Sequence, residues 1–128
     1  MTDKIAVIDD DEVYQMIISR YIDKSGVYRQ AEYYQFPQEA LKYYTDTKDN
    51  LPSVMLLDIN MPLMDGWQFL EALQSRFPDV YEHTRIYIVT SSIAFSDKER
   101  FENFPGLAGF LSKPLNVDKL RELGRNEE

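Results

Sequence analysis

Three carboxylates stand directly after apolar segments of the chain, at the points where buried strands would end. Asp9 and Asp10 follow Ile5–Ile8, and Asp58 follows Val54–Leu57. Parallel neighbouring strands end at one edge of a sheet, which would bring these three side chains together. An all-oxygen set of this kind suits Mg²⁺ and does not suit zinc. A carboxylate placed there can also act as a nucleophile toward phosphorus.

A hydroxyl and an ammonium group follow two further apolar segments. Thr90 comes at the end of Ile86–Val89, and Lys113 comes shortly after Gly109–Leu111. A transferred phosphoryl group carries spread negative charge, which a metal ion, a lysine and a hydroxyl donor can offset. The combination indicates phosphoryl transfer to an aspartate, with Thr90 and Lys113 as stabilising groups.

Each of these residues, taken alone, has a simpler structural interpretation. The run Asp9-Asp10-Asp11 could cap a helix that starts after it. Thr90 alone is typical of an ordinary strand end, and Lys113 alone of a solvated surface charge. The joint arrangement at four strand ends favours chemistry over these separate explanations.

Strands and helices are expected to alternate along the chain. Periodicity predicts helices that begin near Glu12, Pro37, Gly66 and Ser96 and after Pro114. Short connections between them predict a doubly wound α/β fold, with helices on both faces of a parallel sheet. The expected strands are Ile5–Ile8, Gln30–Tyr34, Val54–Leu57, Ile86–Val89 and Gly109–Leu111.

Local details of packing are also predicted. Gly66 is expected to supply backbone freedom where the third helix begins. The tyrosine pairs Tyr33-Tyr34 and Tyr43-Tyr44 are expected to pack, with an exposed aromatic patch for a partner as the alternative. The first helix carries two adjacent apolar stripes, Val13, Ile17 and Tyr21 beside Tyr14, Ile18 and Ile22.

Composition and charge narrow the functional classes. The 128 residues are 44% hydrophobic and 28% charged, so we expect a single domain over residues 1–128 without an output domain. The net charge of −8 argues against direct nucleic-acid binding. With no cysteine, a disulfide framework or thiolate metal site is excluded. No apolar run reaches membrane-spanning length and no signal peptide is recognisable, so we expect no membrane insertion and a cytoplasmic location.

Four stretches of the chain carry the predicted chemistry. They are "AVIDDDEV", "LLDINMPLMDG", "IYIVTSS" and "GFLSKP". Together they resemble the receiver domain of two-component response regulators, close to the single-domain chemotaxis type. The resemblance covers essentially the whole chain, although only the second stretch is specific by itself. It implies a flavodoxin-like sheet of five parallel strands in the order 2-1-3-4-5, with five helices.

The resemblance also implies a role for each matching residue. Asp58 would accept a phosphoryl group from a histidine kinase or a histidine phosphotransfer protein. Mg²⁺ would be bound by Asp10, Asp58 and the backbone carbonyl of Asn60, with Asp9 acting mainly through water. Lys113 would pair with Asp58 and then with the phosphoryl group.

A two-state switch is implied by the same resemblance. Thr90 would move to hydrogen-bond the phosphoryl group, and Phe110, at the switch-aromatic position, would rotate inward. Pro114 stands where the family often has a cis peptide bond. The output would pass to a separate protein, and the only reactions expected of the chain are its own phosphorylation and dephosphorylation.

Two departures from the family pattern lie near the carboxyl terminus. Pro105-Gly106 in "ENFPGLAGF" should cut short the helix that starts near Ser96. The final helix is expected to end near Leu123 or Gly124. In the family these helices contribute to the face that contacts partners, so the phosphorylation chemistry is better supported than the output face.

Two alternatives stay open. A haloacid-dehalogenase-like phosphatase opens with DxDx[TV], which the residues from Asp9 to Val13 fit, with Asp9 as nucleophile and Asp11 as acid. This alternative leaves Asp58 unexplained. The further acidic metal motif of that family is also missing after Lys113. A phosphorylation-independent pseudo-receiver would bind partners without chemistry, but the complete set of site residues argues against it.

The only histidine, His83, lies between the third helix and the fourth strand. We expect it at the surface, away from the strand ends. A phosphohistidine donor must therefore come from another protein.

Overall fold

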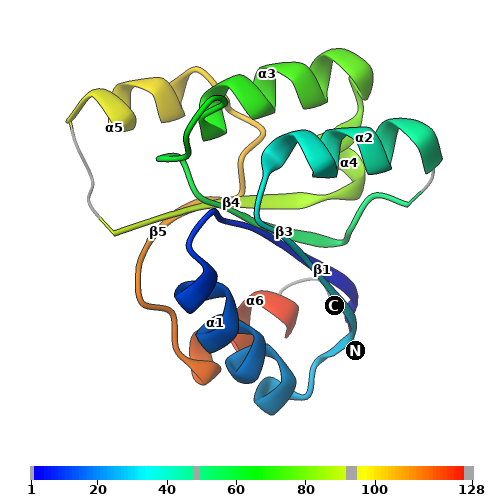
Figure 1. Ribbon diagram of the computed structural model, residues 1–128, viewed down its shortest axis with the longest axis vertical. Coiled ribbons are helices and arrows are strands. Elements are labelled where there is room, and N and C mark those ends of the chain that lie inside the picture. The colour runs from blue at the N-terminus through cyan, green and yellow to red at the C-terminus, as the bar shows by residue number, and fades with distance from the viewer. Residues whose placement is uncertain (1, 48–49, 92–94, 126–128) are drawn as a thin grey trace.

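A five-stranded parallel sheet forms the centre of the chain in a computed structural model that describes residues 2–47, 50–91 and 95–125. Its strand order, β2-β1-β3-β4-β5, confirms the predicted order. Helices cover both faces of the sheet (Figure 1). The strands are β1 Thr2–Ile8, β2 Tyr28–Tyr34, β3 Val54–Leu57, β4 Arg85–Thr90 and β5 Gly109–Ser112. The helices are α1 Glu12–Ser25, α2 Pro37–Thr47, α3 Gly66–Arg76, α4 Val80–His83, α5 Phe95–Glu102 and α6 Val117–Arg125.

The central strands are those with continuous apolar runs. Every residue of β3 is buried, and so are the last five of β1 and of β4. Such runs are typical of parallel strands covered on both faces. The edge strands β2 and β5 contain exposed and half-buried residues, as their mixed sequences predict.

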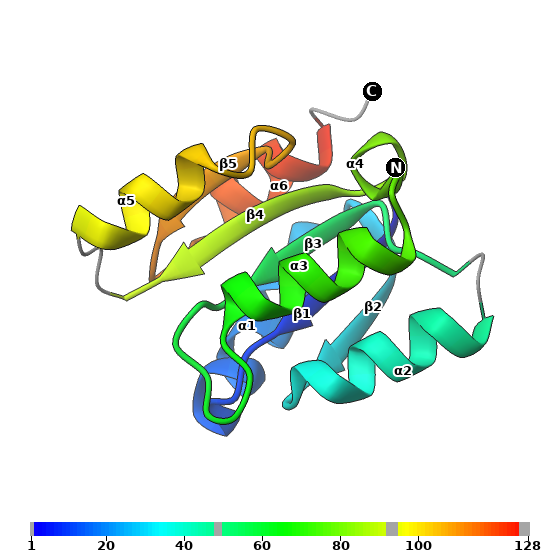
Figure 2. The same cartoon turned by 90° about the horizontal axis from the view of Figure 1, so that it is seen from above.

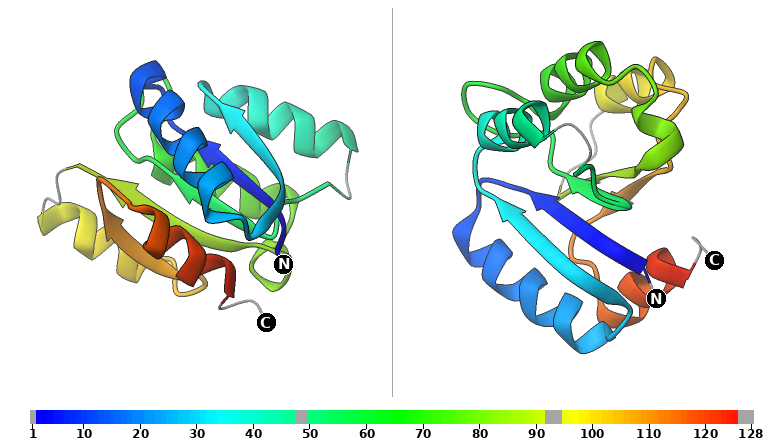
Figure 3. Two further views of the ribbon diagram at one scale, coloured as in Figure 1. Left: turned by 90° about the horizontal axis from the view of Figure 1, so that it is seen from below. Right: turned by 90° about the vertical axis from the view of Figure 1, so that its right-hand side faces the viewer.

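The two faces of the sheet bury separate apolar cores. Helices α1 and α6 cover one face, as Figure 3 shows from below, and contribute Ile18, Ile22 and Leu120 to its core. Helices α2, α3 and α5 lie on the other face, where Tyr44 and Phe69 are among the largest fully buried side chains. Burial of this kind stabilises the fold by roughly 1.5–3 kcal/mol for each large side chain.

The described part of the chain has six helices, one more than the five expected. The additional one, α4, is a single turn between α3 and β4, too short to produce a helical period in the sequence. Helix α5 ends at Glu102, before Pro105, which confirms its predicted early end. Helix α6 continues to Arg125, slightly beyond the expected end.

Only one of the two apolar stripes on α1 faces the sheet along its whole length; of the other, only Tyr21 packs against the core. Ile18 and Ile22 are buried, whereas Val13 is 66% exposed and Ile17 is 42% exposed. Met16 beside them is 57% exposed. These three residues, Val13, Met16 and Ile17, are called the α1 apolar surface below.

Three of the four paired tyrosines pack as predicted, whereas Tyr33 is 38% exposed. Tyr34, Tyr43 and Tyr44 form a cluster with ring centroids 5.7–6.3 Å apart, and Tyr44 is fully buried. The cluster therefore contributes to the core rather than forming an exposed patch.

Within the described segments, no helix has the length and apolar character needed to cross a membrane.

Candidate functional site

The register of the sheet brings the first and third strand ends to one level. Ile8 of β1 pairs with Leu57 of β3, so Asp9 and Asp58 each stand one residue beyond the same pair. The amide of Asp58 donates to the carbonyl of Ile8 at 3.0 Å, which fixes the two ends together. Figure 2 shows the loop between β3 and α3 extending beyond these strand ends.

Three carboxylates gather at this edge, as the sequence predicts. Asp9, Asp10 and Asp58 each present an oxygen, and these oxygens lie within 4.8 Å of one another. Asp9 is only 2% exposed and Asp58 only 6% exposed, while Asp10 is half-buried. The cluster is called the acidic site below.

Burial makes the negative charge of the acidic site costly. It raises the pKa of Asp58 to about 6, with a further rise from the charge of Asp9 and a partial offset from Lys113. Burial likewise raises the pKa of Asp9, although a hydrogen bond from Lys113 acts in the opposite direction. A hard divalent cation would offset this charge, and three carboxylate oxygens are ligands that Mg²⁺ prefers. The residues present therefore fit Mg²⁺.

Lys113 reaches both buried carboxylates from the end of β5. Its Nζ lies 2.5 Å from Oδ2 of Asp9 and 4.0 Å from Oδ2 of Asp58. The expected neighbour, Asp58, is therefore the more distant of the two, and Asp9 is the closer partner. The Lys113 amide donates to the Thr90 carbonyl at 2.8 Å, and the peptide bond to Pro114 is cis.

Thr90 and Phe110 are carried by β4 and β5, which lie beyond β3 on the side away from β1. Thr90 is the last residue of β4 and is fully buried. Phe110 pairs with Ile88 in the sheet, and strand alternation places Thr90 on the same face as Ile88. The Phe110 ring is half-buried against Phe101 of α5, in an edge-to-face arrangement with centroids 5.5 Å apart.

The loop after Asp58 folds back closely over the end of β3. The Asn60 amide lies 3.4 Å from Oδ1 of Asp58, which keeps Asn60 beside the carboxylate. Gly66 begins α3, and a Cβ there would lie 2.6 Å from the Asp58 carbonyl oxygen and 2.8 Å from Cα of Ile59. Gly66 is thus required for close approach of two backbones. Backbone freedom, the expected reason, does not apply, because Gly66 has no positive φ.

Asp11 performs the capping role that the sequence left open for the acidic run. It is the N-cap of α1, and its Oδ1 accepts hydrogen bonds from the amides of Val13 and Tyr14 at 3.0 and 3.1 Å. Asp9 and Asp10 belong to the acidic site instead. A carboxylate committed to capping is poorly suited to the acid role that the phosphatase alternative assigns to Asp11.

Two residues of α1 belong to the site although no motif singled them out. Gln15 donates from Nε2 to the carbonyls of Asp9 and Tyr34, both at 3.0 Å, and so ties α1 to the ends of β1 and β2. The Tyr14 ring lies under Lys113, with Nζ 4.1 Å from its centroid. In the sequence, the only indication that Gln15 belongs to the site is that a polar residue occupies an inward-facing helical position. Tyr14 gives no such indication, because it fits an apolar stripe of the helix.

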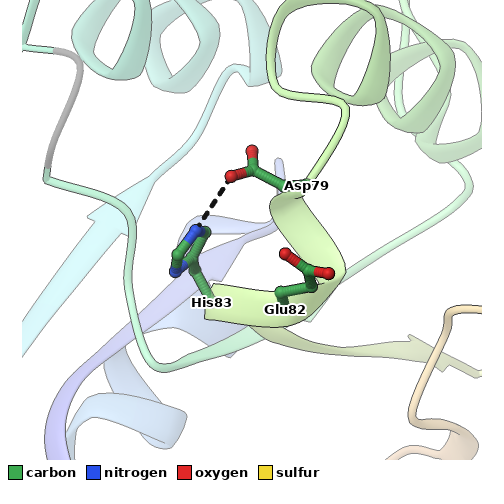
Figure 4. Close-up of side chains that lie close together, drawn as sticks. All are labelled: Asp79, Glu82 and His83. Atoms are coloured by element: carbon green, nitrogen blue, oxygen red, sulfur yellow. Dashed lines mark hydrogen bonds and ion pairs between the residues drawn. The ribbon is translucent and has the colours of Figure 1, made fainter.

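His83 lies in a second cluster, with Asp79 and Glu82 around the single turn of α4 (Figure 4). All three side chains are exposed, and His83 Nε2 lies 3.0 Å from Oδ2 of Asp79. Helix α4 precedes the start of β4, so this cluster lies at the opposite edge of the sheet from the acidic site. The expected position of His83, at the surface and away from the strand ends, is confirmed.

Known proteins resemble this chain over nearly its full length. The family model for the response regulator receiver domain matches residues 5–124. Sporulation initiation phosphotransferase F of Bacillus subtilis is 26% identical over 124 residues, covering 95% of this chain and 90% of that protein. Response regulator Rre1 of Synechocystis sp. is 25% identical over 123 residues, covering 95% of this chain. The chain spans 50% of the length of Rre1, and 8% of the length of hybrid signal transduction histidine kinase D of Dictyostelium discoideum.

Solved structures show the same fold. A response regulator receiver protein from Dyadobacter fermentans has a TM-score of 0.83 and 26% identity, covering 97% of this chain and 96% of that one. Chemotaxis protein CheY4 of Vibrio cholerae has a TM-score of 0.78 and 25% identity, with 98% of each chain covered. These matches favour neither the phosphatase nor the pseudo-receiver alternative. This chain belongs to the response regulator receiver domain family of two-component signalling.

Proposed function

We propose that residues 1–128 form a single receiver domain that is switched by phosphorylation of Asp58. The observation that carries this proposal is the position of Asp58 at the end of a buried strand, within 4.8 Å of two other carboxylates and 4.0 Å from Lys113. Receiver domains accept phosphoryl groups from histidine kinases or phosphotransfer proteins, and we propose that one of these is the donor.

The reaction transfers a phosphoryl group from a donor imidazole to a carboxylate. An Asp58 oxygen attacks phosphorus and forms the O–P bond of an acyl phosphate, while the P–N bond to the histidine breaks. The electron pair of that bond stays on the imidazole nitrogen, which takes up a proton from water, so the donor histidine leaves as a neutral imidazole. Hydrolysis of the acyl phosphate by water restores Asp58, and we expect no turnover of an external substrate.

Asp9, Asp10, Asp58 and the backbone carbonyl of Asn60 would hold Mg²⁺ in this proposal. When bound, the ion supplies positive charge beside the transferring group. Lys113, whose Nζ lies 4.0 Å from Asp58 Oδ2, supplies a second positive charge. Both are needed because a buried site containing three carboxylates otherwise repels a phosphoryl group.

The switch consists of Thr90 and Phe110. We propose that Thr90 turns its hydroxyl toward the phosphoryl oxygens and that the half-buried Phe110 ring follows it inward. Phe110 contacts Phe101 of α5, so this movement would change the packing of α5 against the sheet. The face around α5 is therefore our candidate for contact with a separate output protein. The net charge of −8 argues against nucleic acid as the direct target.

The α1 apolar surface is our candidate contact for the phosphoryl donor. Helix α1 begins three residues after Asp9, so its first turn, which carries Val13, directly follows the acidic site in the chain. A donor protein that brings an imidazole to Asp58 must cover this edge of the sheet, and exposed apolar residues next to it are typical of a protein contact. We place this exchange in the cytoplasm.

The direct test is intact mass after incubation with Mg²⁺ and acetyl phosphate. We expect one phosphoryl group on the wild-type chain and none on Asp58→Asn. Labelling that survives in Asp58→Asn would move the nucleophile to another residue and contradict the proposal. A folded wild-type chain that takes up no phosphoryl group, from acetyl phosphate or from histidine kinases, would also contradict it.

A further inference from the structure

The aromatic ring of Tyr14 packs against the ammonium group of Lys113. Nζ lies 4.1 Å from the ring centroid, well within the range of a cation–π interaction. We propose that Tyr14 is a positioning residue that holds Lys113 for phosphoryl transfer to Asp58. This inference rests on the proposed function, because the proposed function gives Lys113 the role of stabilising the phosphoryl group.

The ammonium group is held from two sides. Asp9 Oδ2 lies 2.5 Å from Nζ and accepts a hydrogen bond, while the Tyr14 ring lies 4.1 Å from Nζ. The Lys113 side chain is 14% exposed, so the contact is largely shielded from water. Asp58 Oδ2, at 4.0 Å, is within reach of a small movement of the same group.

A ring face suits this role because it attracts the cation without using an N–H donor. An ammonium group has three donors on a flexible four-carbon stem. A third carboxylate next to Nζ would occupy a donor and add negative charge to the acidic site. The ring holds the ammonium group in place instead. The donors that Asp9 does not use then remain available for the phosphoryl oxygens.

The ring, rather than the hydroxyl group, carries the interaction. The Tyr14 hydroxyl oxygen is buried and has no hydrogen-bond partner among the described residues. The Tyr14 amide donates to Asp11 Oδ1 at 3.1 Å, so the α1 N-cap fixes the position of the residue that carries the ring. Phenylalanine should therefore replace Tyr14 without loss, whereas leucine should not.

The test compares Tyr14→Leu with Tyr14→Phe and with Tyr21→Leu. Tyr21 lies seven residues later on α1 and packs against the same apolar core, so Tyr21→Leu is a matched control for loss of a ring. Phosphorylation by acetyl phosphate with Mg²⁺ is measured by intact mass, because a small donor does not depend on the α1 apolar surface. We expect Tyr14→Leu to be slower by about 2- to 30-fold, the range for a cation–π contact, and the other two to match the wild type.

A second readout does not depend on phosphorylation. In the Mg²⁺-free chain, the Tyr14 ring current should move the Lys113 ε-methylene proton resonances upfield, with Lys113→Arg providing their assignment. This upfield shift should persist in Tyr14→Phe and disappear in Tyr14→Leu. Tyr14→Met replaces the leucine variant if urea unfolding shows that the latter is not folded.

Three results would overturn the inference. They are phosphorylation of Tyr14→Leu at the wild-type rate, equal slowing in Tyr14→Phe, and the absence of an upfield shift in the wild-type chain. A wild-type chain that shows the upfield shift but takes up no phosphoryl group would instead contradict the proposed function. The two failures are therefore distinguishable.

Discussion

Replacing Asp58 with asparagine should stabilise the Mg²⁺-free chain at neutral pH. The carboxylate is 6% exposed and lies beside Asp9, so its charge is unfavourable in the folded state. Asparagine keeps nearly the same shape and removes that charge. Removing a functional residue would then increase stability, which is the reverse of what most substitutions do.

The size and pH range of the effect follow from the pKa of Asp58. Because the pKa rises from 3.8 to about 6 on folding, the folded chain binds this proton more tightly than the unfolded chain. The contribution of Asp58 to wild-type stability should therefore fall as pH rises from about 4 to about 6, by up to about 3 kcal/mol, and then stay level. Asp58→Asn lacks this loss, so the two chains should be similar near pH 4 and differ most above pH 6.

Urea unfolding in EDTA at several values of pH measures this difference directly. Asp3→Asn is the matched control, because Asp3 is exposed and its loss should change stability by less than about 0.5 kcal/mol. Added Mg²⁺ should narrow the difference by binding the folded wild type. The reasoning is refuted if Asp58→Asn is no more stable than the wild type at pH 7.5, or if its advantage is unchanged at pH 4.5.

Three further outcomes are expected. Gly66→Ala should destabilise the chain by about 1–3 kcal/mol in urea unfolding, because the new Cβ would lie 2.6 Å from the Asp58 carbonyl oxygen; an unchanged midpoint would mean that the loop yields easily. Asp11→Ala should cost about 1 kcal/mol by removing the α1 N-cap, and Asp11→Ser should recover most of it, as thermal unfolding can measure. Lys113→Met should slow phosphorylation of Asp58 by acetyl phosphate about a hundredfold, as followed by intact mass, and a rate near that of the wild type would exclude Lys113 from phosphoryl stabilisation.

The strands that carry the site were predictable because their sequences are continuous and apolar. Val54–Leu57 is a strand with the predicted bounds, and it is buried throughout. Once parallel neighbours are assumed, Asp9 and Asp58 must end at one level, since each stands one residue beyond a paired position. The ends of the next two strands likewise pointed to Thr90 and Lys113, and the family resemblance added Phe110.

What the sequence did not reveal depends on contacts between distant elements. The Tyr14–Lys113 contact joins residues that are 99 positions apart, and neither belongs to a shared local pattern. The closer approach of Lys113 to Asp9 than to Asp58 is a matter of less than two ångströms, which spacing along the chain does not encode. The exposed side of α1 was also hidden, because two apolar stripes on one helix look equally suited to the core.

The separation of the two apolar cores by the sheet has a kinetic consequence. Under the proposed function, the donor approaches over α1, whereas Phe110 and α5 lie on the opposite face of the sheet. A target bound at α5 would leave the donor's route open, so a ternary complex of donor, receiver and target is sterically allowed. Signal passage then does not require the target to wait for the donor to leave, and the duration of the signal would be set by the lifetime of the acyl phosphate.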